Sequence, residues 1–354
     1  MRILDRYIGR TVIASSLTML LALVSIFSFF KFLDELENVG QGRYGIPQVI
    51  EYIALSTPYL AYQLFPMAAL VGALLGLGVL VKNSEITAMR AAGVSLPRIV
   101  AAVLKASLLL MLLAVIIGEF IAPVTEEEAR TGRSIAMADQ ITLKSRYGFW
   151  SRDGSSYINI RRILPGDQIE SIYIYEFDQS HRLRTSTYAR RATYQEGRWL
   201  LEDIQQSIIG DESVTRREAG KAAWDSLLRP ELLNIVLIRP ESLSLWGLVK
   251  YIDYLQANGQ RSLPYEQALW VKLVYPLATV VMVLLAVPMV LGRGREVKLG
   301  QRVMIGALVG LLFHIFNQAS GQIGILYDLS PVLSAAGPTL LTLAAALLLL
   351  RRVH

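Results

Sequence analysis

Six long stretches of the sequence contain almost no charged residue, and each is long enough to cross a membrane as a helix. Five of them carry no Asp, Glu, Lys or Arg at all, and the sixth is interrupted only near its ends, by Lys105 and Glu119. A helix needs roughly 20 apolar residues to cross the hydrocarbon core of a bilayer. The pattern therefore predicts six membrane-spanning helices, at residues 11–30, 53–81, 99–122, 273–291, 303–327 and 329–350.

Between the third and fourth of these stretches, apolar and polar residues alternate and turn residues recur. Such alternation is typical of strands that bury one face, and short strands at regular spacing are typical of a sandwich or jellyroll. Helices predicted at residues 126–137 and 242–256 join this β domain to the spans. The predicted strands are residues 156–161, 171–177, 184–191, 198–202, 213–217 and 233–238.

The predicted architecture is a polytopic α-helical membrane protein with a β domain, a sandwich or jellyroll, inserted between its third and fourth transmembrane helices. Residues 1–122 contain an N-terminal interfacial helix at residues 1–10, the first three spans and a cytoplasmic segment at residues 82–97. Residues 123–266 form the β domain with its connecting helices, and residues 267–354 form the last three spans.

Composition agrees with a membrane protein, and the distribution of charge predicts its orientation. The 354 residues are 53% hydrophobic and only 18% charged, against about a quarter charged in soluble domains. Short loops on one side of the predicted membrane carry 12 basic residues, whereas those on the other carry only Lys31 and Arg43. Basic loops face the cytoplasm, so both termini are predicted to be cytoplasmic. The 12 are Arg2, Arg6, Arg10, Lys82, Arg90, Arg98, Arg293, Arg295, Lys298, Arg302, Arg351 and Arg352.

Several classes of protein are disfavoured by the same sequence. The net charge of +6 reflects topology, because the β domain carries 19 Lys or Arg against 20 Asp or Glu, whereas a nucleic-acid-binding domain needs a basic face. Cys is absent, and His181, His314 and His354 fall in three different regions. No ATPase phosphate-binding loop occurs, and a literal G-x-G-x-x-G at residues 40–45 follows a span instead of a strand. The chain is therefore predicted not to be an enzyme and to bind no metal or cofactor itself.

Polar residues within the fifth predicted span form one helical stripe. Such a stripe either bonds to a neighbouring helix or lines a cavity filled by water or an amphiphile. Paired glycines at residues 72 and 76, and at 306 and 310, allow helices to pack closely. The stripe consists of His314, Asn317, Gln318, Gly321 and Gln322.

Lys31 ends the first span, directly after an aromatic segment that includes Phe27. Its ammonium either reaches to the membrane interface or contacts an anionic head group above the aromatic side chains. Arg130 and Arg133, one turn apart just beyond the third span, are placed to act with it, because arginine donates to phosphate through a planar fork.

The segment at residues 82–97 has the signals of a short capped helix. Glu85 lies in its first turn, Gly93 can end it and Pro97 prevents its continuation. Because the predicted topology places this segment in the cytoplasm, it is either an ordinary loop or a contact for a cytoplasmic partner.

Four segments together resemble the YjgP/YjgQ (LptF/LptG) family of lipopolysaccharide-export permeases, and among these the G-type subunit. They are residues 4–11 (LDRYIGRT), 40–44 (GQGRY), 65–78 (FPMAALVGALLGLG) and 117–123 (IGEFIAP). The resemblance covers essentially the whole chain. It implies a multi-pass protein of the bacterial inner membrane that extracts lipopolysaccharide as one subunit of an ABC exporter.

The resemblance also implies several partners. It implies a heterodimer with the homologous F-type permease subunit, powered by a cytoplasmic ABC ATPase dimer that holds ATP and Mg. Lipid would pass to a single-span periplasmic β-jellyroll protein and a bridge protein toward the outer membrane. Residues 82–97 would be the coupling helix that contacts the ATPase. In this chain, Glu85 would contact a basic residue of the ATPase, and Arg90, Ala92 and Gly93 would belong to the same contact surface.

For the substrate, the resemblance implies that Lys31 meets the phosphates of lipid A and that spans one, two and five line the cavity. Relatives often carry further lysines where this chain has Glu37 and Asn38, so Lys31 is expected to act with Arg43, Arg130 or Arg133. The residues expected to contact lipid are Lys31, Phe27, Phe65, Phe313, Arg130, Arg133 and, on an inner strand, Ile160.

Two alternatives to lipopolysaccharide export fit the same sequence. One is an ABC permease for another amphiphile, such as a lipoprotein. The other is a membrane-anchored periplasmic scaffold that needs no ATPase.

Overall fold

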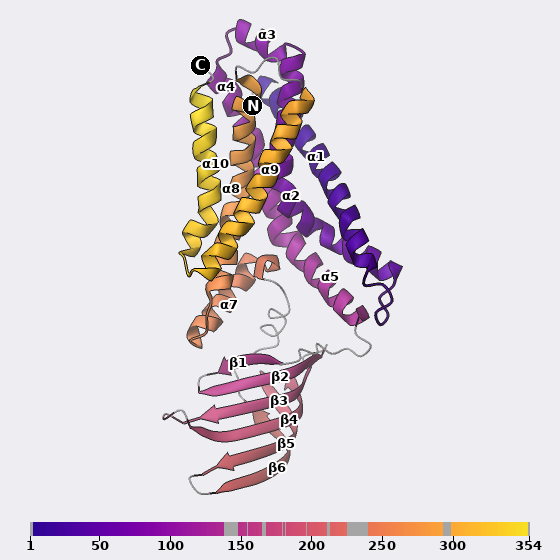
Figure 1. The fold of residues 1–354 in the computed structure, drawn as a ribbon, viewed down its shortest axis with the longest axis vertical. Coiled ribbons are helices and arrows are strands. Elements are labelled where there is room, and N and C mark those ends of the chain that lie inside the picture. Colours follow the sequence, from indigo (N-terminus) through magenta and orange to yellow (C-terminus); the bar gives the residue numbers. More distant parts are fainter. Residues whose placement is uncertain are drawn as a thin grey trace.

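The protein consists of a helical bundle with a β-sheet beyond one end, as Figure 1 shows. This computed structural model describes residues 3–352 except 138–147, 154, 165–167, 179, 181, 196, 211–212, 225–239 and 293–298. The described residues contain six helices long and apolar enough to cross a membrane. The six spans predicted from hydropathy are therefore confirmed, each overlapping one of these helices over most of its length.

The spanning helices are α1 (Ile3–Leu36), α2 (Ile46–Lys82), α4 (Leu96–Ile116), α8 (Leu263–Leu291), α9 (Leu299–Leu326) and α10 (Pro331–Arg351). Helix α4 continues through the π-helical turn η1 (Ile117–Ile121) into α5 (Ala122–Met137). Short helices α3 (Glu85–Ala91), η2 (Pro240–Ser242) and α7 (Leu245–Ala257) lie in the connections.

The first turns of α1 continue directly into the first span, because residues 3–10 belong to one uninterrupted helix with it. That the helix at residues 1–10 is interfacial stays a prediction. The Asp5 carboxylate has partners inside the protein: it lies 3.1 Å from Arg98 Nη2 and 2.7 Å from Lys105 Nζ, both on α4. These turns therefore pack against the bundle.

Helices α2 and α8 form the centre of the bundle, and α1 and α9 flank it. In the most apolar part of each helix, 78% of α2 and 72% of α8 is buried, against 22% of α1 and 17% of α9. Glycines allow the close contacts that the sequence predicts: a Cβ on Gly72 would lie 2.2 Å from Ser16 Cα of α1. Likewise, a Cβ on Gly306 would lie 2.1 Å from Leu74 Cδ1, so α9 packs closely on α2.

The inserted antiparallel sheet is confirmed, and its described strands pair in sequential order from β1 to β6. Buried isoleucines face one another in the register, for example Ile160 opposite Ile172. The strands are β1 (Phe149–Asp153), β2 (Ser156–Leu164), β3 (Gln168–Phe177), β4 (Leu183–Gln195), β5 (Arg198–Ile209) and β6 (Val214–Trp224). Strand β1 was not among the predicted strands, and the strand predicted at residues 233–238 lies outside the described residues.

Helix α7 joins the sheet to the bundle. Its Tyr251 and Leu255 side chains belong to the same buried cluster as Ile160 of the sheet. The hydroxyl groups of Tyr254 and Ser151 lie 2.7 Å apart. Helices α5 and α7 thus confirm the two predicted connecting helices.

Figure 1 shows both ends of the described chain, together with α3, at the end of the bundle away from the sheet. We call this the far end, and the opposite one the sheet end.

Candidate functional site

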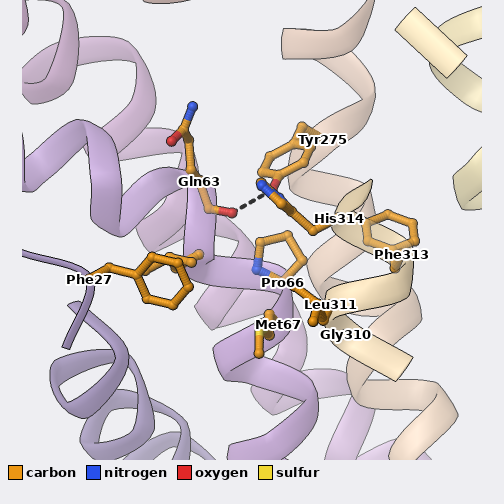
Figure 2. A pocket seen from close by; sticks show the side chains of 10 residues that line it. Phe27, Gln63, Pro66, Met67, Tyr275, Gly310, Leu311, Phe313 and His314 are labelled. Atoms are coloured by element: carbon orange, nitrogen blue, oxygen red, sulfur yellow. Dashed lines mark hydrogen bonds between the residues drawn. The ribbon is translucent and has the colours of Figure 1, made fainter. Parts of the chain in front are cut away.

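A mostly apolar pocket opens between α1, α2, α8 and α9, near the middle of the spanning helices. Figure 2 shows side chains from all four helices around it. Pockets lined by apolar side chains with a few polar groups are the usual form of a ligand site. Its lining consists of Phe27, Gln63, Leu64, Pro66, Met67, Tyr275, Gly310, Leu311, Phe313 and His314.

The wall formed by α2 contains a proline, Pro66, inside the helix. Proline has no N–H and cannot complete the helical hydrogen bond to the residue four positions earlier. Next to this break, the Tyr275 hydroxyl of α8 donates to the carbonyl oxygen of Gln63 at 2.5 Å, the dashed line in Figure 2. On the opposite side Gly310 has no side chain, so α9 approaches Met67.

The structure separates the three aromatic residues that the sequence assigns to lipid contact. Phe27 of α1 and Phe313 of α9 both line the pocket. Phe65 does not line the pocket, although it and Phe313 both belong to the buried core of the bundle, at 2% and 7% exposure. Of the predicted polar stripe, His314 lines the pocket, whereas Gln318 and Gln322 are exposed.

A charged cluster lies at the sheet end of α1 and α5, one helical turn beyond Phe27. Lys31 Nζ lies 4.5 Å from the ring centroid of Tyr52. Arg133 Nε donates to both carboxylate oxygens of Glu35, at 3.0 and 3.1 Å. Arg130 donates to Glu126 at 2.7 Å. Both arginines predicted to bind phosphate are thus brought near Lys31, but each is paired with a carboxylate.

The glycine-rich loop at residues 40–45 caps a helix. Arg43 N–H donates to the Ala136 carbonyl at 2.7 Å, at the end of α5. Gly42 has a φ of +57°, and a Cβ there would lie 2.8 Å from that same oxygen. Tyr44 donates its hydroxyl hydrogen to Glu35 at 3.1 Å, and burial raises the pKa of Tyr44 to about 12. The loop thus fixes Glu35 beside Arg133, which sequence reasoning did not find.

A short helix does form within residues 82–97, as α3 at the far end, although Ser84 before it makes no side-chain capping hydrogen bond. Ile86 anchors it with 4% exposure, while Arg90 and Gly93 are exposed. Glu85 accepts a hydrogen bond of 2.6 Å from the Tyr7 hydroxyl of α1. This helix therefore contacts the first span and presents charged residues at the surface.

On the predicted β path, Ile160 is 1% exposed and lies within the buried core of the sheet. Its side chain is thus covered in this structure. Elsewhere, the described residues contain no group of three or more His, Asp or Glu side chains that could hold a metal ion. That the chain binds no cofactor stays a prediction.

A further ion pair was not predicted. Lys272 Nζ of α8 lies 3.1 Å from Glu119 Oε2 of η1, and the Lys272 side chain is only 8% exposed. The sequence marks Glu119 as a charge near the end of a span, but its partner lies 153 positions along the chain. Hydropathy contains no signal that pairs them.

Comparisons with known proteins match this chain to one family of membrane permeases over nearly its whole length. Residues 6–352 match the family described as "Lipopolysaccharide export system permease LptF/LptG". The chain is 36% identical to the lipopolysaccharide export system permease protein LptG of Haemophilus influenzae, covering 99% of this chain and 98% of that protein. It is 34% identical to the protein of the same name from Escherichia coli K12, with the same coverage.

Proposed function

Because the chain belongs to the LptF/LptG family of lipopolysaccharide export system permeases, we propose that it is the G-type transmembrane subunit of an exporter that extracts lipopolysaccharide from the inner membrane. As a member of this family it is a permease subunit of a multi-pass type, not an enzyme in its own right. The alternative substrate is another amphiphile, such as a lipoprotein.

The observation that carries this proposal is the position of a cation directly beside an apolar pocket. Phe27 lines the pocket, and Lys31 follows one turn later on the same face of α1. A lipid with several acyl chains and a phosphorylated head group needs both environments side by side. Phe27 and Phe313 would contact acyl chains, and Lys31 would meet phosphate with Arg133 and Arg130 behind it.

The surfaces of the bundle support the proposed partners. Helices α1 and α9 expose most of their apolar surface, and the homologous F-type subunit would cover part of it. An ABC ATPase dimer holding ATP and Mg would contact α3, with Glu85 facing a basic residue of the ATPase. In this arrangement the far end is cytoplasmic, and the sheet lies in the periplasm, where it passes lipid to a single-span jellyroll protein and the bridge protein.

The direct test is to purify the complex from membranes and identify its bound lipid by mass spectrometry. Lipopolysaccharide is the expected ligand. Recovery of lipoprotein without lipopolysaccharide would contradict the proposed substrate.

Replacing Lys31→Met is expected to lower the amount of copurified lipopolysaccharide by about tenfold. The substitution removes the proposed hydrogen bond from the Lys31 ammonium to a lipid phosphate, and such a charged hydrogen bond stabilises binding more than a neutral one does. The matched control is Lys31→Arg, which keeps a cation above Tyr52 and should retain the lipid. Quantifying lipid A phosphate per mole of complex measures both. Equal lipid in all three proteins would show that Lys31 only reaches to the interface.

Replacing Glu35→Gln is expected to increase lipid retention, whereas Lys31→Met lowers it. The carboxylate now neutralises Arg133, so its removal leaves one more positive charge for phosphate. The gain should be about 1.4- to fivefold, since a partly exposed ion pair contributes about 0.2–1 kcal/mol. Glu37→Gln is the control, because Glu37 is exposed two residues further along. An unchanged or lower lipid content in Glu35→Gln would contradict this competition.

A further inference from the structure

Three distant segments of the chain meet at the ion pair between Glu119 and Lys272. Both oxygens of Glu119 accept from the backbone N–H of Leu245, at 2.8 and 3.1 Å. Lys272 donates to the carbonyl oxygen of Leu243 at 2.5 Å as well as pairing with Glu119. Spans three and four therefore hold the residues at which the chain returns from the β domain.

The contact with Leu245 holds the first turn of α7. Leu245 is the first residue of that helix, after the cap Ser244, whose hydroxyl accepts from Gly247 N–H at 3.1 Å. The first N–H groups of a helix have no partner within it, and a carboxylate there also interacts favourably with the helix dipole. Glu119 thus fixes both the position and the direction of α7.

On one side, this junction is connected to the pocket. Gly118, next to Glu119, lies against Tyr62 of α2, where a Cβ would approach the ring to 2.4 Å. The Tyr62 ring lies 5.4 Å from that of Tyr275, and Tyr275 lines the pocket. A displacement of the pocket wall would therefore be transmitted to Glu119 through the rings of Tyr275 and Tyr62.

On the other side, α7 ends in the core of the sheet. Tyr251 and Leu255 are buried there, and Tyr254 bonds to Ser151 of β1. Helix α7 therefore connects the two parts of the protein over 13 residues: its first turn is hydrogen-bonded to the spans, and its last turns pack in the core of the β domain.

Stability alone does not explain this junction. A buried ion pair loses so much solvation that apolar side chains of similar volume often stabilise a protein equally well. Ionisable groups inside spans and π-helical turns are both uncommon, and both concentrate at functional positions. Here both occur at one point, where η1 and α8 hold the first turn of α7.

We propose that Glu119 and Lys272 are positioning residues for lipid transfer, which hold α7 so that lipid leaving the pocket reaches the β domain. The inference rests on the proposed function, because it presumes that lipid occupies the pocket. It adds a step that the pocket and the cation cluster do not provide: alignment of the sheet with the outlet of the spans.

The sharpest variant is Leu245→Pro. Proline is tolerated at the first position of a helix, and Ser244 before it has the extended backbone that a following proline requires, with ψ of 159°. The substitution removes the backbone N–H that donates to Glu119 and leaves both side chains of the ion pair in place. Leu245→Ala is the matched control, because it shortens the side chain and keeps the N–H.

Lipid position is measured in the full complex in membranes with p-benzoylphenylalanine in place of Phe27 or, at the half-buried edge of the sheet core, Ile163. We expect lipopolysaccharide crosslinks at both positions in the parent protein and in Leu245→Ala. In Leu245→Pro, crosslinks at position 27 should persist while those at position 163 fall about tenfold. The ratio of the two is independent of how much complex accumulates.

A second variant, Glu119→Gln, keeps an oxygen acceptor for Leu245 but loses the attraction to Lys272. It is expected to lower the ratio by less than Leu245→Pro does. An unchanged ratio in Leu245→Pro would overturn the inference and leave the proposed function standing. Absence of lipopolysaccharide crosslinks at position 27 in the parent protein would instead overturn the proposed function.

Discussion

Glu85→Arg is expected to abolish productive coupling between this subunit and the ATPase proposed as its partner, the largest functional effect of any substitution described here. Glu85 begins α3 at the far end of the bundle, beside exposed residues such as Arg90. If a basic residue of the ATPase faces it, the substitution turns an attraction into a repulsion, and like charges across an interface cost several kcal/mol. Lipid release per ATP hydrolysed should fall by more than about tenfold.

The structure separates two consequences of this substitution. Glu85 also accepts the hydrogen bond from Tyr7, which links α3 to the span that contains Phe27. Tyr7→Phe removes that bond and leaves the carboxylate for the ATPase. Copurification of the ATPase should therefore fail for Glu85→Arg and persist for Tyr7→Phe.

The measurements are ATPase copurification and lipid release from proteoliposomes. Glu51→Arg is the matched control, since it makes the same change of charge at an exposed position of α2 toward the sheet end. A membrane-anchored scaffold that needs no ATPase would keep all its partners in Glu85→Arg. That outcome would favour the scaffold over the exporter.

Gly72→Ala is expected to give the largest loss of stability. The added Cβ would lie 2.2 Å from Ser16 Cα and 2.6 Å from Ser16 N. Because these are backbone atoms, rotation of a side chain cannot relieve the overlap, and α1 has to move away from α2. Overpacking of a close contact costs about 1–3 kcal/mol, occasionally more, so we expect the upper part of that range and a lower Tm in detergent.

Gly132→Ala is the control with the opposite expected sign. Gly132 lies in α5, and no atom lies within 4 Å of a Cβ placed there. Alanine is favoured over glycine in a helix by about 0.8–1.0 kcal/mol, so this variant should be neutral or more stable. A thermal unfolding temperature for Gly72→Ala equal to or above that of Gly132→Ala would contradict the packing of α1 on α2.

The elements of this protein were largely predictable, because the signals that form them are local. Uncharged stretches of bilayer length mark the spans, and strand alternation marks the inserted sheet. Residues near 85 and 93 mark both ends of α3. Strand β1 was missed because its segment, Phe149–Asp153, is short and has no clear alternation.

The candidate site was predictable only in part, for a different physical reason. Phe27, Lys31 and Phe313 can be chosen from their place on apolar helices, but Phe65 fulfils the same criterion and faces the bundle core. Hydropathy is nearly uniform around a membrane helix, so it does not indicate which face meets a pocket and which meets another helix. Likewise, Arg130 and Arg133 are evident in the sequence, and Glu126 lies four residues before Arg130 on the same predicted helix. The pairing of Arg133 with Glu35, by contrast, has no signal in the sequence.

The sequence by itself determined the six spans and the position of the sheet between them, because hydropathy patterns extend over one or two dozen neighbouring residues. For residues 82–97 it left a short helix and an ordinary loop both open. Only the tertiary structure decided that Arg133 is paired with Glu35, 98 positions away, and that Glu119 and Lys272 together hold α7. Those contacts depend on how helices are rotated and packed against one another. Such rotation is set by glycine contacts and kinks acting together across the whole bundle, and no local pattern records it.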